Sequence, residues 1–539
     1  MKKNTFIQGA FVATAGIIIV KLIGLLYVVP FNAIIGEKGG ALYGYAYNIY
    51  MLFLSISSAG FPFAISKLTS EYNALGYKRA ILDTYKIATR IIFLISFVIF
   101  ILLFLFAPQI AHLIIGSSTG GNTISDIAFV IRMVSFAILV VPFLSVAKGF
   151  LQGHKYISPT SISQIIEQVV RVILILVGSF LALKVFNSDL KTAVGIAVSG
   201  AFFGGLAAYI YLKLKIKQNK LLTITVDEHR ISTKEIIKKI FSYSIPFIIV
   251  SLVYNLYNTV DMILVSRTMN DILHMDAKVI ESVISVFTTW GVKLNNILLA
   301  VTTGLTTSLI PNIVASFTKD NMKDVNSKFN KAMQCVILII VPATIFLSLL
   351  VQPVWTLFYG KSVYGPIVYK MFVFTALFGG FHSIVVNTLQ GLSKYRLVIS
   401  SVLLGLIINT VFDVPFMLIS NYFGFNPSYG AIIAAMFGYS VSIMISLNVL
   451  HKKYHFDFSS TLTKIPSYLI SNIIFIITIL IMKIFIPTNL TGRLIQIPIL
   501  LVYGVISFII YIIINYKAGN LENIINLKKG RKNENRNSD

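Results

Sequence analysis

The sequence predicts an all-α integral membrane protein with about 14 transmembrane helices, in two parallel six-helix repeats plus two C-terminal helices. Three observations lead to this fold class: the composition, the lengths of the apolar runs, and short strings that recur at a fixed spacing. Of the 539 residues, 56% are hydrophobic and 12% are charged, whereas soluble domains carry about 25% charged residues. Most of the chain is therefore expected to lie in lipid.

The apolar runs define the predicted spans, because roughly 20 apolar residues are needed to cross a bilayer as a helix. Fourteen runs qualify: 8–35, 42–66, 87–115, 126–150, 159–186, 192–214, 237–266, 282–310, 329–351, 365–390, 396–422, 428–450, 465–487 and 492–516. They predict five parts of the chain: an N-lobe of six spans (1–216), a cytoplasmic linker (217–236), a C-lobe repeat of six spans (237–455), two further spans (456–516) and a basic cytoplasmic tail (517–539).

Recurring strings indicate the internal repeat. Leu-Gln-Gly occurs at 151–153 after the fourth span and again at 389–391 after the tenth, 238 residues later, each time followed by a Lys-Tyr pair. Two glycine pairs recur 244 residues apart: Gly60 with Gly304, and Gly116 with Gly360. The period is six spans, an even number, so both copies have the same orientation in the membrane. We expect the glycine of each Leu-Gln-Gly string to break the helix at an inner turn.

The basic residues indicate orientation rather than nucleic-acid binding. The chain has 45 Lys and Arg against 20 Asp and Glu, a net charge of +25, but they lie between apolar runs, with no soluble domain to hold them. If both termini are cytoplasmic, 32 Lys and Arg fall in cytoplasmic segments and 9 in external ones. This bias fits the positive-inside rule. The expected partners include membrane lipids and exclude nucleic acid.

No motif in the sequence indicates an enzyme. Cys335 is the only cysteine, and there is no Walker A loop, His/Cys metal cluster or catalytic dyad. Two parallel six-helix halves are instead typical of transporters. Without a nucleotide-binding domain, an ion gradient, the membrane potential or the substrate gradient would have to drive transport.

Ionisable residues inside spans are costly in lipid and usually face a cavity or a partner. Lys21 and Lys293 lie deep in spans one and eight, in different halves, with no acid beside them. We expect both to face a central cavity and to hold an anionic ligand such as a phosphate; the alternative is that each pairs with a distant acid. Glu167 and Arg171, at i and i+4 on span five, predict an intrahelical ion pair that could still line the cavity.

Two acids are buried in the second half. Asp261 and Asp413 each follow an Asn-Thr-Val string, and Asn409 lies one turn before Asp413 on the same face. Carboxylate and amide oxygens, with carbonyls opened by Pro415, suit Na⁺ or proton exchange. The alternative is that these groups make structural hydrogen bonds only. No other cofactor is expected.

Four strings, in this order, carry a resemblance over essentially the whole chain: VKLIG at 20–24, AGFPFAISKL at 59–68, LQGHKYISPTSISQIIEQVVR at 151–171 and SLIPNI at 308–313. The chain resembles the multidrug/oligosaccharidyl-lipid/polysaccharide (MOP) flippase superfamily, and within it the MurJ-type lipid II flippases and the related stage V sporulation protein B group. The resemblance implies a multi-pass protein of the bacterial cell membrane that flips undecaprenyl-pyrophosphate-linked cell-wall precursors by alternating access, alongside other cell-wall synthesis proteins.

The resemblance also implies residue roles. Lys21 and Lys293 match basic cavity positions on the family's helices one and eight. Asp261, Asn409 and Asp413 match the family's Na⁺ site. Span two departs from the family: it lacks the arginines often found there and has Tyr43, Tyr45, Tyr47 and Tyr50 instead. Either these tyrosines, such as Tyr47, bind sugar, or the preferred glycan differs from that of lipid II.

Three alternative functions stay open at this stage. The substrate could be another lipid-linked polysaccharide unit of the teichoic acid, capsule or O-unit type. A cation-coupled multidrug extruder of the same superfamily is the second, although lysines in the cavity would repel cationic drugs. The third is a membrane scaffold for cell-wall synthesis, which would have no need for Lys21 and Lys293 to face one cavity.

Overall fold

A computed structural model describes residues 6–116, 121–223, 231–488, 490 and 492–521. Helices are the only regular elements in these ranges, as the fold class predicts. The middle of the predicted linker (224–230) and the predicted tail from residue 522 lie outside the described residues. The predicted lobe boundaries stay a prediction.

The α-helices are α1 (Phe6–Leu26), α2 (Val28–Ser58), α3 (Phe61–Ala74), α4 (Lys78–Leu105), α5 (Ala107–Ile115), α6 (Ile124–Ser135), α7 (Val141–Gly153), α8 (Ile157–Ile173), α9 (Leu190–Gln218), α10 (Thr233–Arg267), α11 (Ala277–Thr288), α12 (Trp290–Thr318), α13 (Met322–Leu349), α14 (Val351–Tyr359), α15 (Tyr364–Phe372), α16 (Phe374–Gly391), α17 (Tyr395–Tyr422), α18 (Ser428–Tyr454), α19 (Ser459–Leu462), α20 (Ile465–Phe485) and α21 (Gln496–Lys517). Short 3₁₀ or π segments are η1 (Phe136–Leu139), η2 (Leu174–Gly178), η3 (Leu181–Val185) and η4 (Thr268–Ile272).

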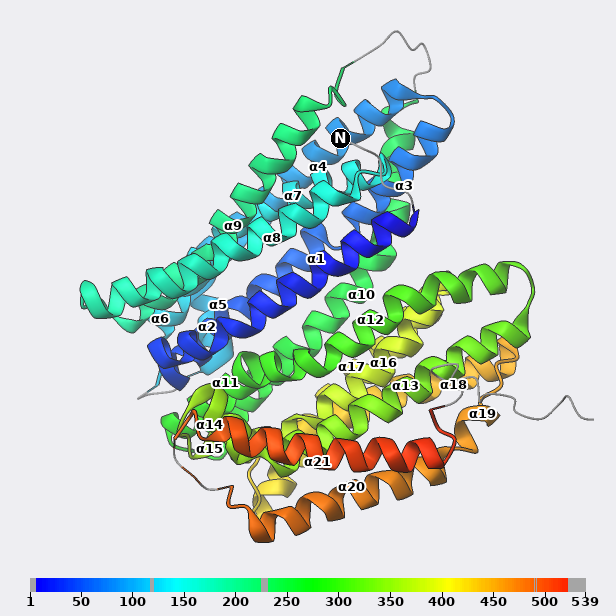
Figure 1. Cartoon of the computed structure of the whole chain (residues 1–539). Coiled ribbons are helices and arrows are strands. Elements are labelled where there is room, and N and C mark those ends of the chain that lie inside the picture. Colours follow the sequence, from blue (N-terminus) through cyan, green and yellow to red (C-terminus); the bar gives the residue numbers. More distant parts are fainter. Residues whose placement is uncertain (1–5, 117–120, 224–230, 489, 491, 522–539) are drawn as a thin grey trace, which may run out of the picture. The chain divides into compact units, whose positions relative to one another are not determined.

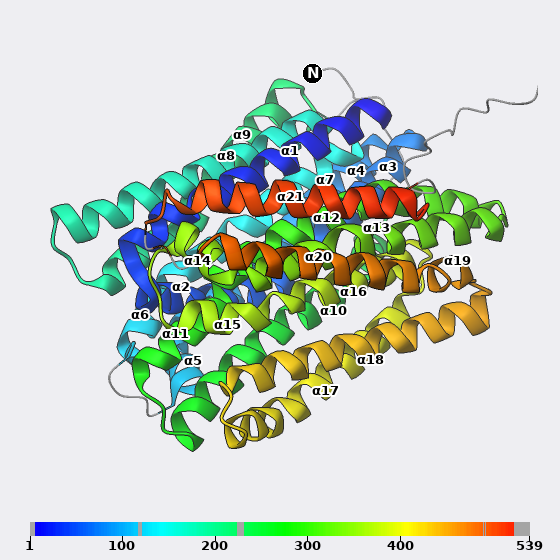
Figure 2. The same ribbon diagram turned by 60° about the horizontal axis from the view of Figure 1, so that its bottom comes forward.

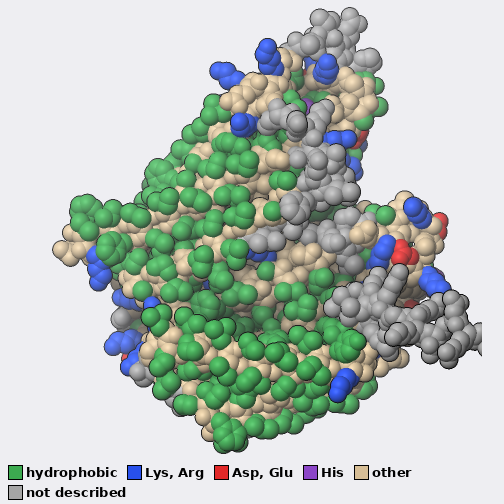
Figure 3. Space-filling model, in the orientation of Figure 1, with side chains coloured by type: hydrophobic (Ala, Val, Ile, Leu, Met, Phe, Trp, Pro, Cys, Tyr) green, Lys and Arg blue, Asp and Glu red, His purple; other side chains and the backbone are tan. Residues whose placement is uncertain are grey.

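Thirteen stretches of the described residues are long and apolar enough to cross a membrane, and α1 adds the shorter apolar stretch Ala15–Leu26. The first predicted span, 8–35, is interrupted at Tyr27, between α1 and α2. It ends at Gly36, whose positive φ of 65° breaks α2. Hydrophobic side chains cover the flanks of the helices in Figure 3, whereas Lys and Arg gather near helix ends. This distribution is what a lipid-facing surface requires.

Helix bounds recur at the spacing of the sequence repeat. α13 begins and ends 244 residues after α4, and α14 begins and ends 244 residues after α5. Gly116 ends α5 with φ 62° and Gly360 ends α14 with φ 79°. Glycine suits both positions because a side chain is strained at positive φ.

The two Leu-Gln-Gly strings form the same turn. Tyr156 N–H donates to Leu151 O and Lys155 N–H to Gln152 O, both at 2.9 Å; Lys394 donates to Leu389 and Ser393 to Gln390 at the same distances. This is the hydrogen-bond pattern of a Schellman motif. Each helix ends at its glycine, but the expectation that the glycine breaks the helix is wrong: the left-handed residue is Lys155 (φ 65°) in one copy and Ser393 (φ 59°) in the other. The Lys-Tyr pairs are therefore shifted by one position between the two turns.

The chain forms two compact units. The first holds residues 1–294 and 402–438; there α1 lies along α8, and α8 lies along α9 (Figure 1). A hydrophobic core in this unit joins α3, α4, α7, α9 and the first half of α10. The second unit holds residues 295–401 and 439–539, in which α20 and α21 run side by side (Figure 2). Every candidate site residue predicted from the sequence belongs to the first unit.

The inner turn gives a stability prediction. Ser393→Gly should stabilise the protein by about 1 kcal/mol, because glycine removes the cost of a left-handed side-chain-bearing residue. Thermal unfolding of the purified protein in detergent measures this. Ser400→Gly, at an exposed interior position of α17, is the matched control and should destabilise by about 1 kcal/mol. A lower melting temperature for Ser393→Gly would contradict the assignment of the turn.

Candidate functional site

The predicted ion pair on α8 forms, and it gains a third member. Arg171 Nη2 lies 2.7 Å from Glu167 Oε1, as the i, i+4 spacing predicts. Lys148 Nζ, from α7, lies 3.1 Å from Glu167 Oε2. The three side chains are only 16–17% exposed. Two cations thus share one carboxylate within membrane-spanning helices, and one positive charge remains in excess.

Close helix packing positions this pair. Gly200 and Gly204 of α9, four residues apart, lie against the backbone of α8: a Cβ on Gly200 would be 3.0 Å from Arg171 O, and one on Gly204 would be 2.5 Å from Glu167 O. Small residues at this spacing allow two membrane helices to approach closely. The back of α8 is therefore fixed against α9 at the level of Glu167 and Arg171.

Tyrosines of α2 lie beside Arg171. Tyr43 and Tyr47 stack with ring centroids 5.3 Å apart, and Tyr47 and Tyr50 follow at 5.6 Å. Their spacing of four and three residues puts them on one helix face. All three act electrostatically on Arg171. Tyr43 and Tyr50 are buried, with 4% and 1% exposure, so Tyr47 is the member of the row that is open to contact.

Lys293 belongs to the same neighbourhood. Its Nζ lies 5.3 Å from the centroid of the Tyr27 ring, at the break between α1 and α2. Its electrostatic neighbours include Tyr27, Tyr47 and Arg171. Tyr47 is therefore an electrostatic neighbour of both Lys293, from the second half of the sequence, and Arg171, from the first. We call Lys148, Glu167, Arg171 and Lys293 the cationic cluster.

Lys21 is half-buried on α1, which packs along α8. One turn further, a Cβ on Gly24 would lie 3.5 Å from Gln168 Nε2, beside the Glu167–Arg171 pair. Lys21 is thus near the level of the cluster. A cavity shared by Lys21 and Lys293 stays a prediction.

The predicted acids meet across two helices. Asn409 Nδ2 of α17 donates to Asp261 Oδ1 of α10 at 2.5 Å, and Asp413 is an electrostatic neighbour of Asp261. Asn409 and Asp413 are fully buried. Gly438 of α18 packs on this group, since its Cβ would lie 3.1 Å from Asn409 Cβ. We call Asp261, Asn409 and Asp413 the acid site.

Three oxygens of the acid site fit a cation. Asn409 Oδ1 and both carboxylate oxygens of Asp413 are buried and make no hydrogen bond. Buried polar atoms without a partner are costly, and carboxylate and amide oxygens are the ligands that hard cations prefer. Two neighbouring carboxylates also repel each other unless a cation or proton intervenes. The residues present therefore fit Na⁺ or a proton. No group of three or more His, Cys, Asp or Glu side chains suitable for a metal occurs among the described residues.

Two buried charged residues escaped the sequence analysis. Lys148 lies near the end of the fourth span, where the positive-inside rule already accounts for a lysine. Glu281 of α11 lies at the edge of the eighth span and is 7% exposed; its carboxylate accepts from Asn122 N at 2.6 Å and Asn122 Nδ2 at 2.8 Å. Both side chains sit at the end of an apolar run, and their orientation depends on a helix distant in sequence, so no local pattern identifies them.

Contacts between α2 and α11 fix the position of the tyrosine row. Thr289 Oγ1 donates to Gly40 O at 2.8 Å. A Cβ on Gly40 would overlap the Trp290 ring, and one on Gly44 would overlap Thr288 Oγ1. Glycine at both positions allows the two helices to touch. This contact holds Tyr43 and Tyr47 at the start of α12, where Lys293 lies.

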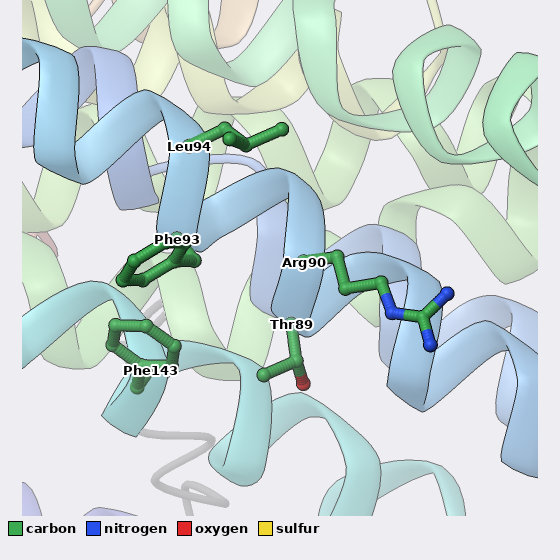
Figure 4. Close-up of a pocket in the computed structure, with 5 residues that line it drawn as sticks. All are labelled: Thr89, Arg90, Phe93, Leu94 and Phe143. Atoms are coloured by element: carbon green, nitrogen blue, oxygen red, sulfur yellow. The ribbon is translucent and has the colours of Figure 1, made fainter.

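A surface hollow on α4 and α7 is separate from these sites. Thr89, Arg90, Phe93, Leu94 and Phe143 line it. Figure 4 shows the Phe93 and Phe143 rings facing each other while the guanidinium of Arg90 points away from them. The ring centroids of Phe93 and Phe143 are 6.5 Å apart. Phe93 and Leu94 are more than half exposed, as expected of side chains that face lipid tails.

Comparisons with known proteins identify the family of this chain. The family model described as polysaccharide biosynthesis protein matches residues 6–272. The chain is 31% identical to the lipid II flippase MurJ of Bacillus subtilis (strain 168), over 97% of each chain. It is 24% identical to stage V sporulation protein B of the same organism, over 84% of this chain and 83% of that one.

A solved structure gives the fold independently. The structure described as lipid II flippase MurJ in an inward closed conformation matches with a TM-score of 0.69 and 15% identity, covering 95% of this chain and 99% of that one. The full-length sequence match and the shared fold lead to one conclusion: the chain belongs to the MurJ family of multi-pass membrane proteins.

Proposed function

We propose that this protein flips an undecaprenyl-pyrophosphate-linked cell-wall precursor, with lipid II for peptidoglycan as the first candidate, from the inner to the outer leaflet. The observation that carries the proposal is that Arg171 and Lys293, both in membrane-spanning helices, interact electrostatically with each other and with Tyr47. The similarity to MurJ of B. subtilis over the whole chain supports it.

Charge explains how the cluster would recognise such a lipid. The cluster contains three cations and one carboxylate, so it has an excess of positive charge that an anionic pyrophosphate would neutralise. Arg171 can bind phosphate oxygens in a bidentate manner, whereas Lys293 contributes a compact charge. The partly exposed ring of Tyr47 offers an aromatic surface for sugar. The protein would bind and move the lipid without changing a covalent bond.

The same excess charge argues against a cationic substrate but does not identify the glycan. Teichoic acid, capsule and O-unit precursors that carry the same anionic lipid anchor would satisfy the cluster equally, so the glycan is identified by flipping assays with defined lipids. A multidrug extruder for cationic compounds is disfavoured, because the cluster would repel its substrates. Contacts with other cell-wall synthesis proteins remain part of the proposal.

We propose that the acid site couples transport to Na⁺ or H⁺. Asp261 belongs to α10 and Asn409 and Asp413 to α17, so a cation between them would tie the two helices together. Such an ion biases the inward- and outward-facing populations only by its different affinity for the two states. The unpaired oxygens of Asn409 and Asp413 support this role.

Replacing the basic residues tests the cluster. Lys293→Ala, and likewise Lys21→Ala, should abolish rescue of a strain depleted of its own lipid II flippase, while Lys293→Arg should retain part of it because the charge is kept. Growth is measured at matched membrane levels of each variant. Lys191→Ala removes a lysine that pairs with Asp126 and Asp189 outside the cluster and should rescue fully. Full rescue by both Lys293→Ala and Lys21→Ala would overturn the proposed cavity.

Replacing Asp413 tests the coupling. Asp413→Asn should remove the sodium or pH dependence of flipping and slow it at least about tenfold, while leaving lipid binding unchanged. Asn409→Ala should act in the same direction more weakly, because an amide contributes a dipole rather than a charge. Purified protein in vesicles, with and without an ion gradient, gives both quantities. If wild type responds to neither ion, the acid site is structural.

Labelling tests the proposed cytoplasmic location of both termini. Asn421 at the end of α17 and Ser327 in α13 are both exposed, and the charge bias places them on opposite sides of the membrane. In a background where Cys335 is replaced by serine, Asn421→Cys should react with an impermeant thiol reagent on intact cells and Ser327→Cys should not. The reverse pattern would invert the orientation and the direction of export.

A further inference from the structure

The proposed function gives direct contact with the anion to Arg171 and Lys293, whereas Lys148 lies against Glu167. The two oxygens of this carboxylate are divided between two cations: Oε1 faces Arg171 Nη2 at 2.7 Å, and Oε2 faces Lys148 Nζ at 3.1 Å. The cations come from different helices, α7 and α8, which pack against each other (Figure 1). Because Arg171 and Lys148 use different oxygens of Glu167, the Arg171 side chain can move away while Lys148 stays in place.

Arg171 has hydrogen-bonding capacity to spare. A guanidinium carries five N–H donors. Arg171 Nη2 donates to Glu167, and Arg171 Nε is buried without a hydrogen-bond partner. Arg171 can therefore reach a new acceptor, but the charge-assisted bond to Glu167 competes with any anion that arrives.

The competition would be costly without Lys148. If Arg171 turned from Glu167 to a phosphate oxygen, a carboxylate with no other partner would be left as an unpaired charge in a membrane-spanning helix. Removing one member of a buried ion pair is strongly destabilising for this reason. Lys148 already neutralises the second oxygen, so Glu167 stays paired when Arg171 leaves.

We propose that Lys148 is a positioning residue that keeps Glu167 paired, so that Arg171 can exchange this carboxylate for the pyrophosphate of the substrate. The inference rests on the proposed function, because it assigns a regulating partner to the same site. Glu167 then acts as an internal stand-in for the anion, holding Arg171 in place between cycles. Release of the substrate returns Arg171 to Glu167.

A double-mutant cycle separates this role from the alternatives. The variants are Lys148→Met, Glu167→Gln and both together, in the purified full chain in nanodiscs. The quantity is the dissociation constant for undecaprenyl pyrophosphate, with undecaprenol as the uncharged probe. Lys148→Met should weaken binding of the pyrophosphate at least about tenfold, because Arg171 is then the sole partner of Glu167. Glu167→Gln should bind at least as tightly as wild type, and the double variant should behave like Glu167→Gln.

Several outcomes would overturn the inference. If Lys148→Met weakens binding of undecaprenyl pyrophosphate equally in the wild-type and Glu167→Gln backgrounds, Lys148 touches the ligand itself. No loss in either background would mean that it has no role in binding. If wild type fails to bind undecaprenyl pyrophosphate more tightly than undecaprenol, the proposed function falls together with the inference. The two failures are thus distinguishable.

Matched variants guard against a folding defect. Lys148→Arg keeps the charge beside Glu167 and should bind within about threefold of wild type. Lys148→Gln keeps a hydrogen-bond donor without the charge; it replaces Lys148→Met if that variant does not fold, and its loss should again vanish in the Glu167→Gln background. Lys239→Met removes a lysine that also lies 3.1 Å from a glutamate, Glu71, outside the cluster, and should leave binding unchanged. A loss with Lys239→Met equal to that with Lys148→Met would mean a general effect on stability.

Discussion

A charge inside a membrane-spanning helix needs a partner, because lipid supplies neither counterions nor water. In this protein Glu167 meets that need for two cations from two helices, Lys148 at 3.1 Å and Arg171 at 2.7 Å. The carboxylate lowers the free-energy cost of keeping several basic groups close together inside the bundle. Without it, the cations would repel one another, and their helices would separate or bring in water.

Small residues and aromatic rings place the remaining members around that carboxylate. Gly200 and Gly204 let α9 close on the back of α8, and Gly40 and Gly44 let α2 touch α11 and the start of α12. The second contact aligns Tyr47 of α2 with Lys293 of α12. The cluster is thus built at the meeting of helices from both halves of the sequence, which is where alternating access requires a substrate site.

The acid site obeys the opposite rule. Its carboxylates and amide are buried with too few donors, and three oxygens lack any hydrogen bond. In the cationic cluster one carboxylate stands against three cations, and an excess of positive charge is left for a ligand. In the acid site an excess of negative charge and lone pairs is left for a cation. The two sites belong to one compact unit, so one set of helices carries both the proposed anion and the proposed coupling ion.

The sequence by itself determined what depends on neighbouring residues. Apolar runs specify helices and spans, and the i, i+4 spacing specifies the Glu167–Arg171 pair, because both follow from local backbone geometry. The Leu-Gln-Gly strings mark where two helices end, but the left-handed residues of the turns are Lys155 and Ser393, not the glycines. The sequence also placed Asn409 and Asp413 on one helix face. Tertiary structure decided the rest. Asp261 meets Asn409 across 148 positions, Lys148 turns toward Glu167, and Lys293 shares Tyr47 with Arg171. These contacts depend on which helix faces meet and at what height along the helices. Packing of the whole bundle sets both, so no residue spacing in the sequence predicts them.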